Sequence, residues 1–409
     1  MSHPLRSNEG SGGARTSFRR GWHRGHAMLP RQGFVFGRPL IAIHSDDWGR
    51  VGVRDAEIWD DLRASGVNLG VRPYDYYSLE TAGDLTAVAS MLQRHRDSSG
   101  RPARLGMNFL MANIDFAKVK AASFRRIYTR PLTEGLPEGW NRPGLFEAYR
   151  EGVSAGVFSA ALHGTTHFCR SSAERFLEDS DERGTLLRTL WKAGVPYIHW
   201  RMPWIGFEYA DSAQGREQFL GAEEQKDLVE TAVGIFSQFF STAPRSACAP
   251  GYRADRSTYA AWADCGIRVV QNGPGRVRPP HFESQGASNH LLHLYRTMDF
   301  EPSAGAAFSL KSCMQKAESS FARGIPVLIS VHSINFHSSL RDFRTGTLRR
   351  LDEFLSAMEA KHPDLLYVRD EDLYDLVDKG SFESSDSLMR IEVKKQSRSS
   401  AFLAALGRS

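Results

Sequence analysis

The sequence has few cysteines and no long hydrophobic run. The four cysteines, Cys169, Cys248, Cys265 and Cys313, are widely scattered, without any Cys-x-x-Cys spacing. This distribution argues against a cysteine zinc site and fits buried thiols in a reducing compartment. No apolar stretch approaches the ~20 residues of a membrane-spanning helix, and no apolar segment follows the basic start as in a secretory signal. We therefore expect a soluble protein of cytoplasmic location.

Acidic residues are scarce in the first 38 residues, which contain seven arginines and only Glu9. Rich in Gly, Ser and Arg and poor in apolar residues, residues 1–36 are predicted to form a flexible tail. Such a tail could contact nucleic acid, anionic lipid or no partner, and we expect no specific nucleic-acid binding. Residues 379–409 are Ser-rich and predict a second tail, with a short helix at 401–407. Residues 37–378 are expected to form the folded domain.

Within this domain, short apolar runs alternate with longer amphipathic stretches. A chain that is 41% hydrophobic and 409 residues long can bury a sizeable core. Strands are expected within 39–43, 104–112, 157–163, 246–250, 267–272, 326–332 and 365–369. Helices are expected within 55–66, 85–97, 223–240 and 348–362. The alternation is typical of α/β proteins and predicts a parallel sheet covered on both faces, either a barrel or a doubly wound sheet.

Two adjacent carboxylates, Asp46 and Asp47, follow the first apolar run in "IAIHSDDWGR". Two ionised carboxylates this close repel each other, so a bound metal or a shared proton would explain the pair. Ser-Asp-Asp before a helix is also an ordinary N-terminal cap. From these residues alone, both interpretations stay open.

Other chemically active residues also directly follow apolar runs. His163 follows "SAAL" and His332 follows "LISV". In parallel α/β folds, residues at the carboxyl ends of strands meet on one face of the molecule. We therefore expect His163, His332 and the two aspartates to converge.

The segment "LHGTTHF" adds a second histidine, His167, at i, i+4 from His163, which on a helical turn places both imidazoles on one face. Two imidazoles with one carboxylate can hold a divalent ion and leave coordination positions open for water and substrate. The carboxylate that does not bind the ion can then accept a proton from water beside it. The pattern predicts a catalytic metal site.

The order "HSDD", "HGTTH" and "LISVH" resembles the metal and catalytic motifs of the polysaccharide deacetylase family. This resemblance implies a distorted (β/α) barrel in which Asp46 is the base and Asp47, His163 and His167 are the metal ligands. It implies that His332, which closes the motif from Leu328, is the general acid. The stretch "APGYRAD" is similar to the substrate-groove motif of the family. Tyr252 is then expected to offer its backbone N–H to the oxyanion.

The sequence departs from the family pattern in two places. Gly164 stands where the family usually has Ser or Thr, and Ala249 stands where it usually has the arginine that orients the base. Arg253 or Arg296 could replace that arginine. The interval between the first two motifs is also long for the family.

Further candidates lie in other polar and aromatic stretches. In "WKAGVPYIHWRMPW" the aromatic residues Trp200 and Trp204 could stack on a sugar or pack in the core, and Arg201 could bind an anionic group. Arg296, Asp299 and Glu301 could orient a ligand histidine or form a surface ion cluster. Asn335 and His337 could line the same pocket or be loop residues without such a role. The segment 108–113, which ends a strand, is a further candidate of this kind.

Together these features predict a hydrolase that removes N- or O-acetyl groups from a carbohydrate. The cofactor is expected to be a divalent ion, zinc first, with cobalt, nickel or manganese as alternatives. The partner is expected to be an acetylated carbohydrate. Two rivals are a glycosidase that uses Asp46 or Asp299 with a second carboxylate, and a glycan-binding relative that has lost catalysis along with the arginine.

Overall fold

A computed structural model describes residues 33–197, 202–212, 214–275, 277–284, 290–384 and 387–396. None of the helices in these ranges has both the length and the apolar character required to cross a membrane. The residues 401–407, predicted to form a short helix, lie outside the described part of the chain.

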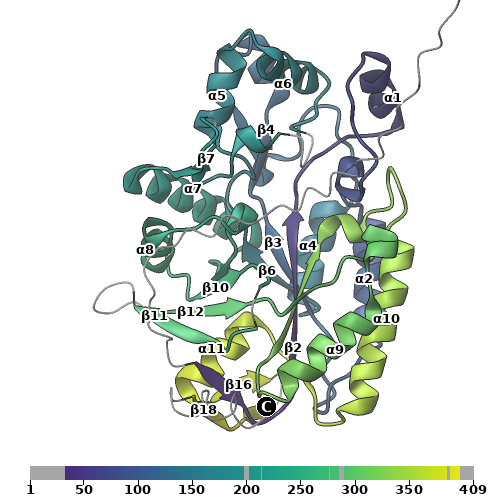
Figure 1. Cartoon of the computed structure of the whole chain (residues 1–409), viewed down its shortest axis with the longest axis vertical. Helices are drawn as coiled ribbons and strands as arrows, with labels where there is room; N and C mark the ends of the chain where they lie inside the picture. The colour runs from purple at the N-terminus through teal and green to yellow at the C-terminus, as the bar shows by residue number, and fades with distance from the viewer. Residues whose placement is uncertain are drawn as a thin grey trace, which may run out of the picture. The chain divides into compact units, whose positions relative to one another are not determined.

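A curled, mostly parallel sheet lies at the centre of the described chain (Figure 1). Its strands run in the order β11 (His281–Ser284), β12 (His290–Tyr295), β10 (Val269–Asn272), β9 (Ser246–Ala247), β6 (Phe158–Leu162), β3 (Leu105–Phe109), β2 (Leu40–Trp48), β14 (Val327–His332) and β13 (Met298–Asp299). The short strand β15 (Leu366–Tyr367) also pairs with β2. All of these pairings are parallel except that of β11 with β12.

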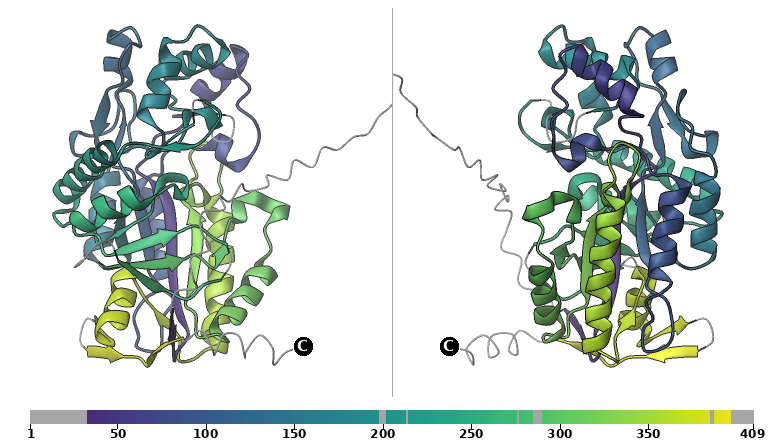
Figure 2. Two further views of the ribbon diagram at one scale, coloured as in Figure 1. Left: turned by 60° about the vertical axis from the view of Figure 1, so that its left-hand side comes forward. Right: turned by 90° about the vertical axis from the view of Figure 1, so that its right-hand side faces the viewer.

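Helices cover the sheet and extend beyond its carboxyl end. They are α1 (Ala56–Ala64), α2 (Ala82–Leu92), α3 (Phe116–Ala121), α4 (Leu145–Ser154), α5 (Arg170–Glu178), α6 (Glu182–Lys192), α7 (Ala222–Phe240), α8 (Arg256–Asp264), α9 (Leu310–Phe321), α10 (Arg344–Lys361) and α11 (Asp370–Lys379). Helices α2 and α10 lie side by side, as both figures show (Figures 1 and 2). Helices α5 and α6 lie beyond the carboxyl end of β2, and α11 lies toward its other end (Figure 1).

The side chains of β2 alternate between its two faces, and each face packs in a different hydrophobic core. Ile41 and Ile43 pack in the main core with the apolar faces of α2, α4, α7, α8, α9 and α10. Leu40 and Ala42 face the opposite way and pack against α11. Because side chains alternate along a strand, His44 and Asp46 continue this second, interior face. The sheet thus directs Asp46 into the space enclosed by its own curvature.

The predicted α/β class and parallel sheet are confirmed. Each of the seven predicted strand segments contains all or part of a strand, and each of the four predicted helical segments contains most of a helix. Among the described strands, β11 and β13 form two unpaired edges, so the barrel is distorted to the point of being open. An open sheet leaves room at its carboxyl end for loops that carry side chains.

The regular structure extends past both predicted domain limits, 37 and 378. Strand β1 (Phe34–Phe36) pairs antiparallel with β18 (Val393–Lys395), and β16 (Ser381–Ser384) pairs with β17 (Ser387–Arg390). Two further short pairs are β4 (Ala112–Ile114) with β5 (Thr129–Pro131) and β7 (Ala210–Asp211) with β8 (Gln218–Phe219). The pair of β1 with β18 links the two ends of the folded domain.

Candidate metal centre and active site

The paired aspartates belong to strand β2 and not to a helix cap. The nearest helix, α1, is capped by Asp55, whose side chain accepts the Ile58 N–H. The register between β2 and β3 shifts between Ser45 and Trp48, and Asp47 has a positive φ of 76°. A bulge of this kind re-aims side chains that would otherwise point to opposite faces. A non-glycine residue held in the left-handed region is a feature that clusters at functional sites.

Asp47, His163 and His167 converge, as the sequence predicts. The Nε2 atoms of His163 and His167 lie 3.6 and 3.3 Å from Oδ1 of Asp47. All three side chains are buried, and among the described residues they form a group able to hold a metal ion. Asp47 Oδ1 accepts no hydrogen bond from any described group. A buried carboxylate oxygen without a hydrogen donor, facing two imidazole nitrogens, fits a divalent ion.

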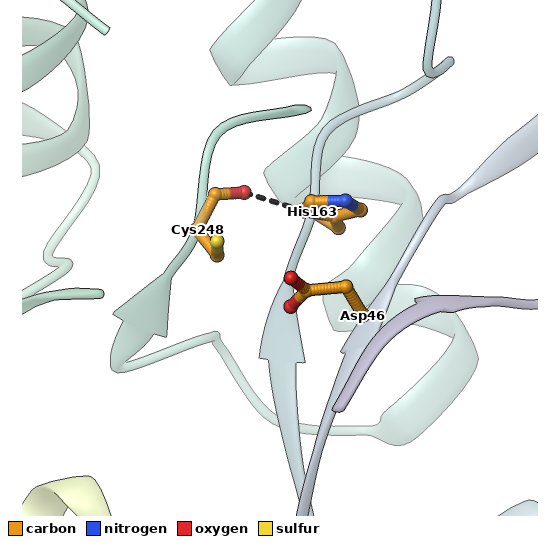
Figure 3. A group of neighbouring side chains, drawn as sticks. All are labelled: Asp46, His163 and Cys248. Carbon is orange, nitrogen blue, oxygen red and sulfur yellow. Dashed lines mark hydrogen bonds between the residues drawn. The ribbon is translucent and has the colours of Figure 1, made fainter. Parts of the chain in front are cut away.

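The other nitrogen of His163 fixes the orientation of its ring. Nδ1 lies 2.7 Å from the carbonyl oxygen of Cys248, to which it donates a hydrogen bond (Figure 3). Because Nδ1 keeps its proton on this carbonyl, Nε2 is the nitrogen that can lose its proton and offer a lone pair to an ion beside Asp47, the arrangement common in metal-binding histidines. Burial lowers the pKa of His163, but the nearby Asp47 carboxylate and the hydrogen bond with the Cys248 carbonyl outweigh it and raise the pKa to about 10. Without an ion, His163 is therefore protonated at neutral pH.

The two histidines lie on a loop and not on a helical turn. Residues 163–169 connect β6 to α5, and Gly164 has a φ of 98°. A Cβ at Gly164 would lie 1.9 Å from Oε2 of Glu208. The other oxygen of Glu208 accepts the N–H groups of Thr165 and Thr166, at 2.7 and 3.0 Å. Glu208 therefore orders the loop and explains why glycine stands where the family usually has Ser or Thr.

A bidentate arginine holds Asp46. Arg296, directly after β12, donates to Oδ2 at 2.5 Å and to Oδ1 at 2.6 Å. Asn108 donates to Oδ1 at 2.6 Å and the Tyr252 hydroxyl to Oδ2 at 3.2 Å. Burial raises the pKa of Asp46, but the charge and hydrogen bonds of Arg296 outweigh it and hold the pKa far below its usual range. Arg296, one of two residues predicted to replace the arginine missing at Ala249, holds the carboxylate.

Buried polar residues continue from Asp46 into the interior of the sheet. Gln271 accepts hydrogen bonds from Asn108 and Arg296 and donates to Asp370 at 2.7 Å. Asp370, the first residue of α11, also pairs with Nε2 of His44 at 2.7 Å. Polar residues of three strands, of the segment directly after β12 and of one helix thus support a single carboxylate.

His332 lies on the other side of Asp46. Its Nε2 is 3.8 Å from Asp46 Oδ2, and its Nδ1 lies 2.7 Å from Oε1 of Glu301. Asn335 donates to the second oxygen of Glu301. Burial lowers the pKa of His332, but Glu301 and then Asp46 outweigh it and raise the pKa to about 9. At neutral pH this histidine carries a proton to donate, and it is 24% exposed.

A second group, Asp46, His163 and Cys248, has ligand atoms within metal-binding distance of one another (Figure 3). Its chemistry does not favour an ion, because Asp46 already accepts hydrogen bonds on both oxygens. The Nδ1 of His163 is also bound to the Cys248 carbonyl. Of the two groups, Asp47, His163 and His167 are therefore the better suited to hold an ion.

The three residues predicted to contact substrate or oxyanion lie in different environments. The N–H of Tyr252 donates to Ala249 O at 2.8 Å, so the expected donor to an oxyanion is already engaged in a turn. Arg253 pairs with Glu217 away from Asp46, so it does not replace the missing arginine. Trp204 packs edge-on against Phe176 with ring centroids 4.4 Å apart, which favours packing over sugar stacking.

The remaining candidates divide in the same way. His337 pairs with Glu80, and Asp299 is exposed on β13. Trp200 and Arg201 lie outside the described residues. Three buried residues of the site were not predicted, Arg50, Glu208 and Gln271. Position gave a signal for two of them, because Gln271 is in a predicted strand and Arg50 closes the "HSDDWGR" stretch.

No family model matches the chain, and no curated protein is similar to it. Its structure is similar to that of a Mycobacterium smegmatis protein described as a polysaccharide deacetylase, with 12% identity over 85% of this chain and 93% of the other, at a TM-score of 0.45. The structure of a Parabacteroides distasonis protein described as a glycoside hydrolase/deacetylase is also similar. The two share 11% identity over 86% of this chain and 74% of the other, at a TM-score of 0.47. A family 4 carbohydrate esterase from Streptomyces lividans, solved with acetate, shares 11% identity over 81% of this chain and 92% of the other, at a TM-score of 0.32. Likenesses this distant carry no information on activity, which depends on the side chains described above.

Proposed function

We propose that this protein is a metal-dependent hydrolase that removes N- or O-acetyl groups from a carbohydrate. One observation carries the proposal: Asp47 Oδ1, buried and without a hydrogen donor, faces the Nε2 atoms of His163 and His167. Beside this group stand a second carboxylate that stays ionised and a histidine that stays protonated.

Asp47, His163 and His167 would hold the ion. A divalent ion bound there lowers the pKa of water and polarises an acyl carbonyl. The donor set of two nitrogens and one carboxylate oxygen suits zinc and also accepts cobalt, nickel or manganese.

Asp46 would accept the proton of the attacking water. Arg296 fixes both of its oxygens, so the carboxylate has one orientation. Its low pKa makes it a poor acceptor for the proton of ordinary water, so proton transfer requires water that an ion has made more acidic. The pairing of a strongly held carboxylate with a metal site thus supports a strictly metal-dependent reaction.

His332 would donate the proton to the leaving amine or alcohol. Glu301 keeps the ring oriented through Nδ1, which directs Nε2 toward Asp46 and the reacting group. Nε2 of the acid then lies 3.8 Å from Oδ2 of the base.

The two rival functions have less support. Catalytic loss was suggested by the missing arginine, and Arg296 supplies that contact. A glycosidase would use Asp46 or Asp299 with a second carboxylate, but Arg296 holds both oxygens of Asp46 and Asp299 is exposed on β13.

The test combines metal content with acetate release from an N-acetylglucosamine oligomer and from acetylated xylan. Asp47→Asn replaces an anionic ligand with a neutral amide, so the purified variant should lose most of its metal and its activity. Asp46→Asn should keep the ion and lose roughly 10²–10⁴-fold in turnover, the usual effect of positioned proton transfer. Asp60→Asn, an exposed position on α1, is the matched control and should change neither quantity.

Full activity and full metal content in both site variants would refute the proposal. Turnover that survives complete removal of the ion would favour a metal-independent hydrolase instead. An ion bound without acetate release from either polymer would favour the glycan-binding relative.

A further inference from the structure

The expected hydrogen-bond donor to the oxyanion is engaged elsewhere in this protein. The N–H of Tyr252 closes a turn with the carbonyl of Ala249. Two hydroxyls beside the site are committed as well, because that of Tyr252 donates to Asp46 and that of Tyr77 donates to the backbone carbonyl of Asp47. Stabilising the charge that develops on the acyl oxygen is usually the largest single contribution to such a reaction, so we expect a different donor.

Tyr74 lies close to the acid, the base and a metal ligand of the proposed site. Its ring is edge-on to the ring of His332, with the centroids 5.3 Å apart. Burial raises the pKa of Tyr74, and four neighbouring groups raise it further: Glu301, Asp47, Tyr252 and Asp46. Such groups act on the phenol because they are near it. A side chain close to acid, base and ligand at once faces the space between them, where the acyl group would react.

The Tyr74 hydroxyl is suited to donate to a bound group. A phenol has an ordinary pKa of about 10, so it keeps its proton near neutral pH. Tyr74 is only partly buried, and His332 beside it is 24% exposed. By contrast, Asp46 and Asp47 are 2% and 1% exposed. The tyrosine therefore lies on the accessible side of the site, which a substrate reaches first.

The short 3-10 helix η1 (Pro73–Tyr76) holds this tyrosine in place. At its start, the N–H of Arg72 donates to Oδ2 of Asp75 at 2.8 Å. The Tyr76 ring stacks on Trp59, with the centroids 4.6 Å apart. Helix η1 also packs against the turn 333–336 that follows β14. The position of the phenol is therefore fixed before a substrate arrives, as an electrostatic contribution to catalysis requires.

We propose that the Tyr74 hydroxyl is a further catalytic group, which donates a hydrogen bond to the oxyanion in place of the Tyr252 N–H. This inference rests on the proposed deacetylase function. As water adds to the acyl carbon and gives its proton to Asp46, the electrons of the C=O bond move to the oxygen. The Tyr74 O–H donates to that oxygen and keeps its own proton. The C=O bond then re-forms, the bond to the leaving nitrogen or oxygen breaks, and His332 gives that atom a proton.

Tyr74→Phe tests this role, because it removes one oxygen atom and keeps the ring against His332. On the polymer from which the wild type releases acetate, kcat should fall about 10²–10³-fold, the usual effect of losing one such donor. KM should stay within about threefold, because the hydrogen bond becomes strong only as the charge develops. Tyr76→Phe, in the same short helix with its ring on Trp59, is the matched control and should change neither constant. Zinc content and thermal unfolding should match the wild type in both variants.

Binding of methylphosphonate to the zinc-loaded full chain is a second measurement, which needs no turnover. Its tetrahedral phosphorus carries the methyl group and charged oxygens that resemble the acetyl intermediate, whatever the leaving group. Calorimetry should show about tenfold or more weaker affinity in Tyr74→Phe, the usual effect of losing one hydrogen bond to a charged group. The affinity of Tyr76→Phe should equal that of the wild type.

An unchanged kcat or an unchanged affinity for methylphosphonate in folded Tyr74→Phe would overturn the inference. A higher KM with the same kcat would also overturn it, because Tyr74 would then bind the sugar before the reaction. A shift in the alkaline limit of turnover would do the same, because Tyr74 would then act through His332. Failure of the proposed function has a different signature: the wild type itself releases no acetate, which removes this inference as well.

Discussion

Two adjacent aspartates acquire different chemistry from two different arginines. Asp46 accepts short hydrogen bonds from Arg296 on both oxygens. Asp47 has a long contact with Arg50 and leaves Oδ1 to the histidines. Burial raises the pKa of both carboxyls, but neighbouring cations outweigh it and lower both below the usual range. Both stay ionised, so what separates base from ligand is which oxygens remain available.

The pairing of His332 with Glu301 predicts the alkaline limit of activity. His332 has a pKa raised to about 9, and an acid must be protonated to act, so turnover should fall as the pH rises through about 9. Glu301→Gln removes the nearest carboxylate and should move this limit to lower pH. The pH profile of turnover measures the shift, with Glu318→Gln on α9 as the control. An unchanged alkaline limit in Glu301→Gln would remove Glu301 from the role of positioning His332.

His163 predicts how metal affinity depends on pH. Without an ion its pKa is about 10, so the incoming ion must displace a proton. Affinity should therefore rise with pH, by about tenfold per unit for one displaced proton, until the pH reaches the pKa. Competition with a chelator of known affinity at pH 6, 7 and 8 gives the slope. An affinity independent of pH would show that the ion does not bind His163.

At the scale of elements, the loop between β6 and α5 depends on a carboxyl group that the loop does not contain. Burial raises the pKa of Glu208 to about 7, although the N–H groups of Thr166 and Thr165 oppose the rise. Because its pKa is raised, Glu208 binds its proton more tightly in the folded protein than in the unfolded chain. Its contribution to stability is therefore fully present below pH 4.5 and is lost as the pH rises to about 7.

Glu208→Gln should therefore abolish one part of the pH dependence of stability. In metal-free protein, the free energy of unfolding of the wild type should fall relative to that of the variant between pH 4.5 and 7, and the difference should stay constant above pH 7. Urea denaturation at several pH values measures it. Parallel curves for the two proteins would mean that Glu208 does not change its protonation on unfolding.

The elements could be predicted from the sequence because their signals are local. Apolar runs gave the strands, and a polar residue after each run gave Asp46, His163 and His332. The bulge that re-aims Asp47 has no such signal, since alternation predicts opposite faces for adjacent residues. Glu208 and Gln271 reach the site through tertiary packing, with 41 residues between Glu208 and Thr166. No spacing in one sequence marks such a contact.

At the scale of the whole molecule, the last helix supports the first motif. Asp370 of α11 binds His44 and Gln271, and Gln271 bonds both to Asn108 and to Arg296, which hold Asp46. The pairing of β1 with β18 joins the two ends of the same domain. The site residues described above, by contrast, all lie between the two predicted tails. We therefore expect deletion of residues 1–32 to leave acetate release unchanged.

The site should also connect the ion to the stability of the entire domain, because its ligands come from β2 and from the loop after β6 near the centre of the sheet. An ion that binds only the folded chain adds about 2.7 kcal/mol to the free energy of unfolding at a hundredfold excess over its Kd. Thermal and urea unfolding with and without zinc should show this gain both in the full chain and in the chain lacking residues 1–32. Asp47→Asn should show little of it, because removing the anionic ligand weakens binding while the fold is kept. A gain of equal size in Asp47→Asn would place the stabilising ion elsewhere and refute the assignment of the metal centre to Asp47, His163 and His167.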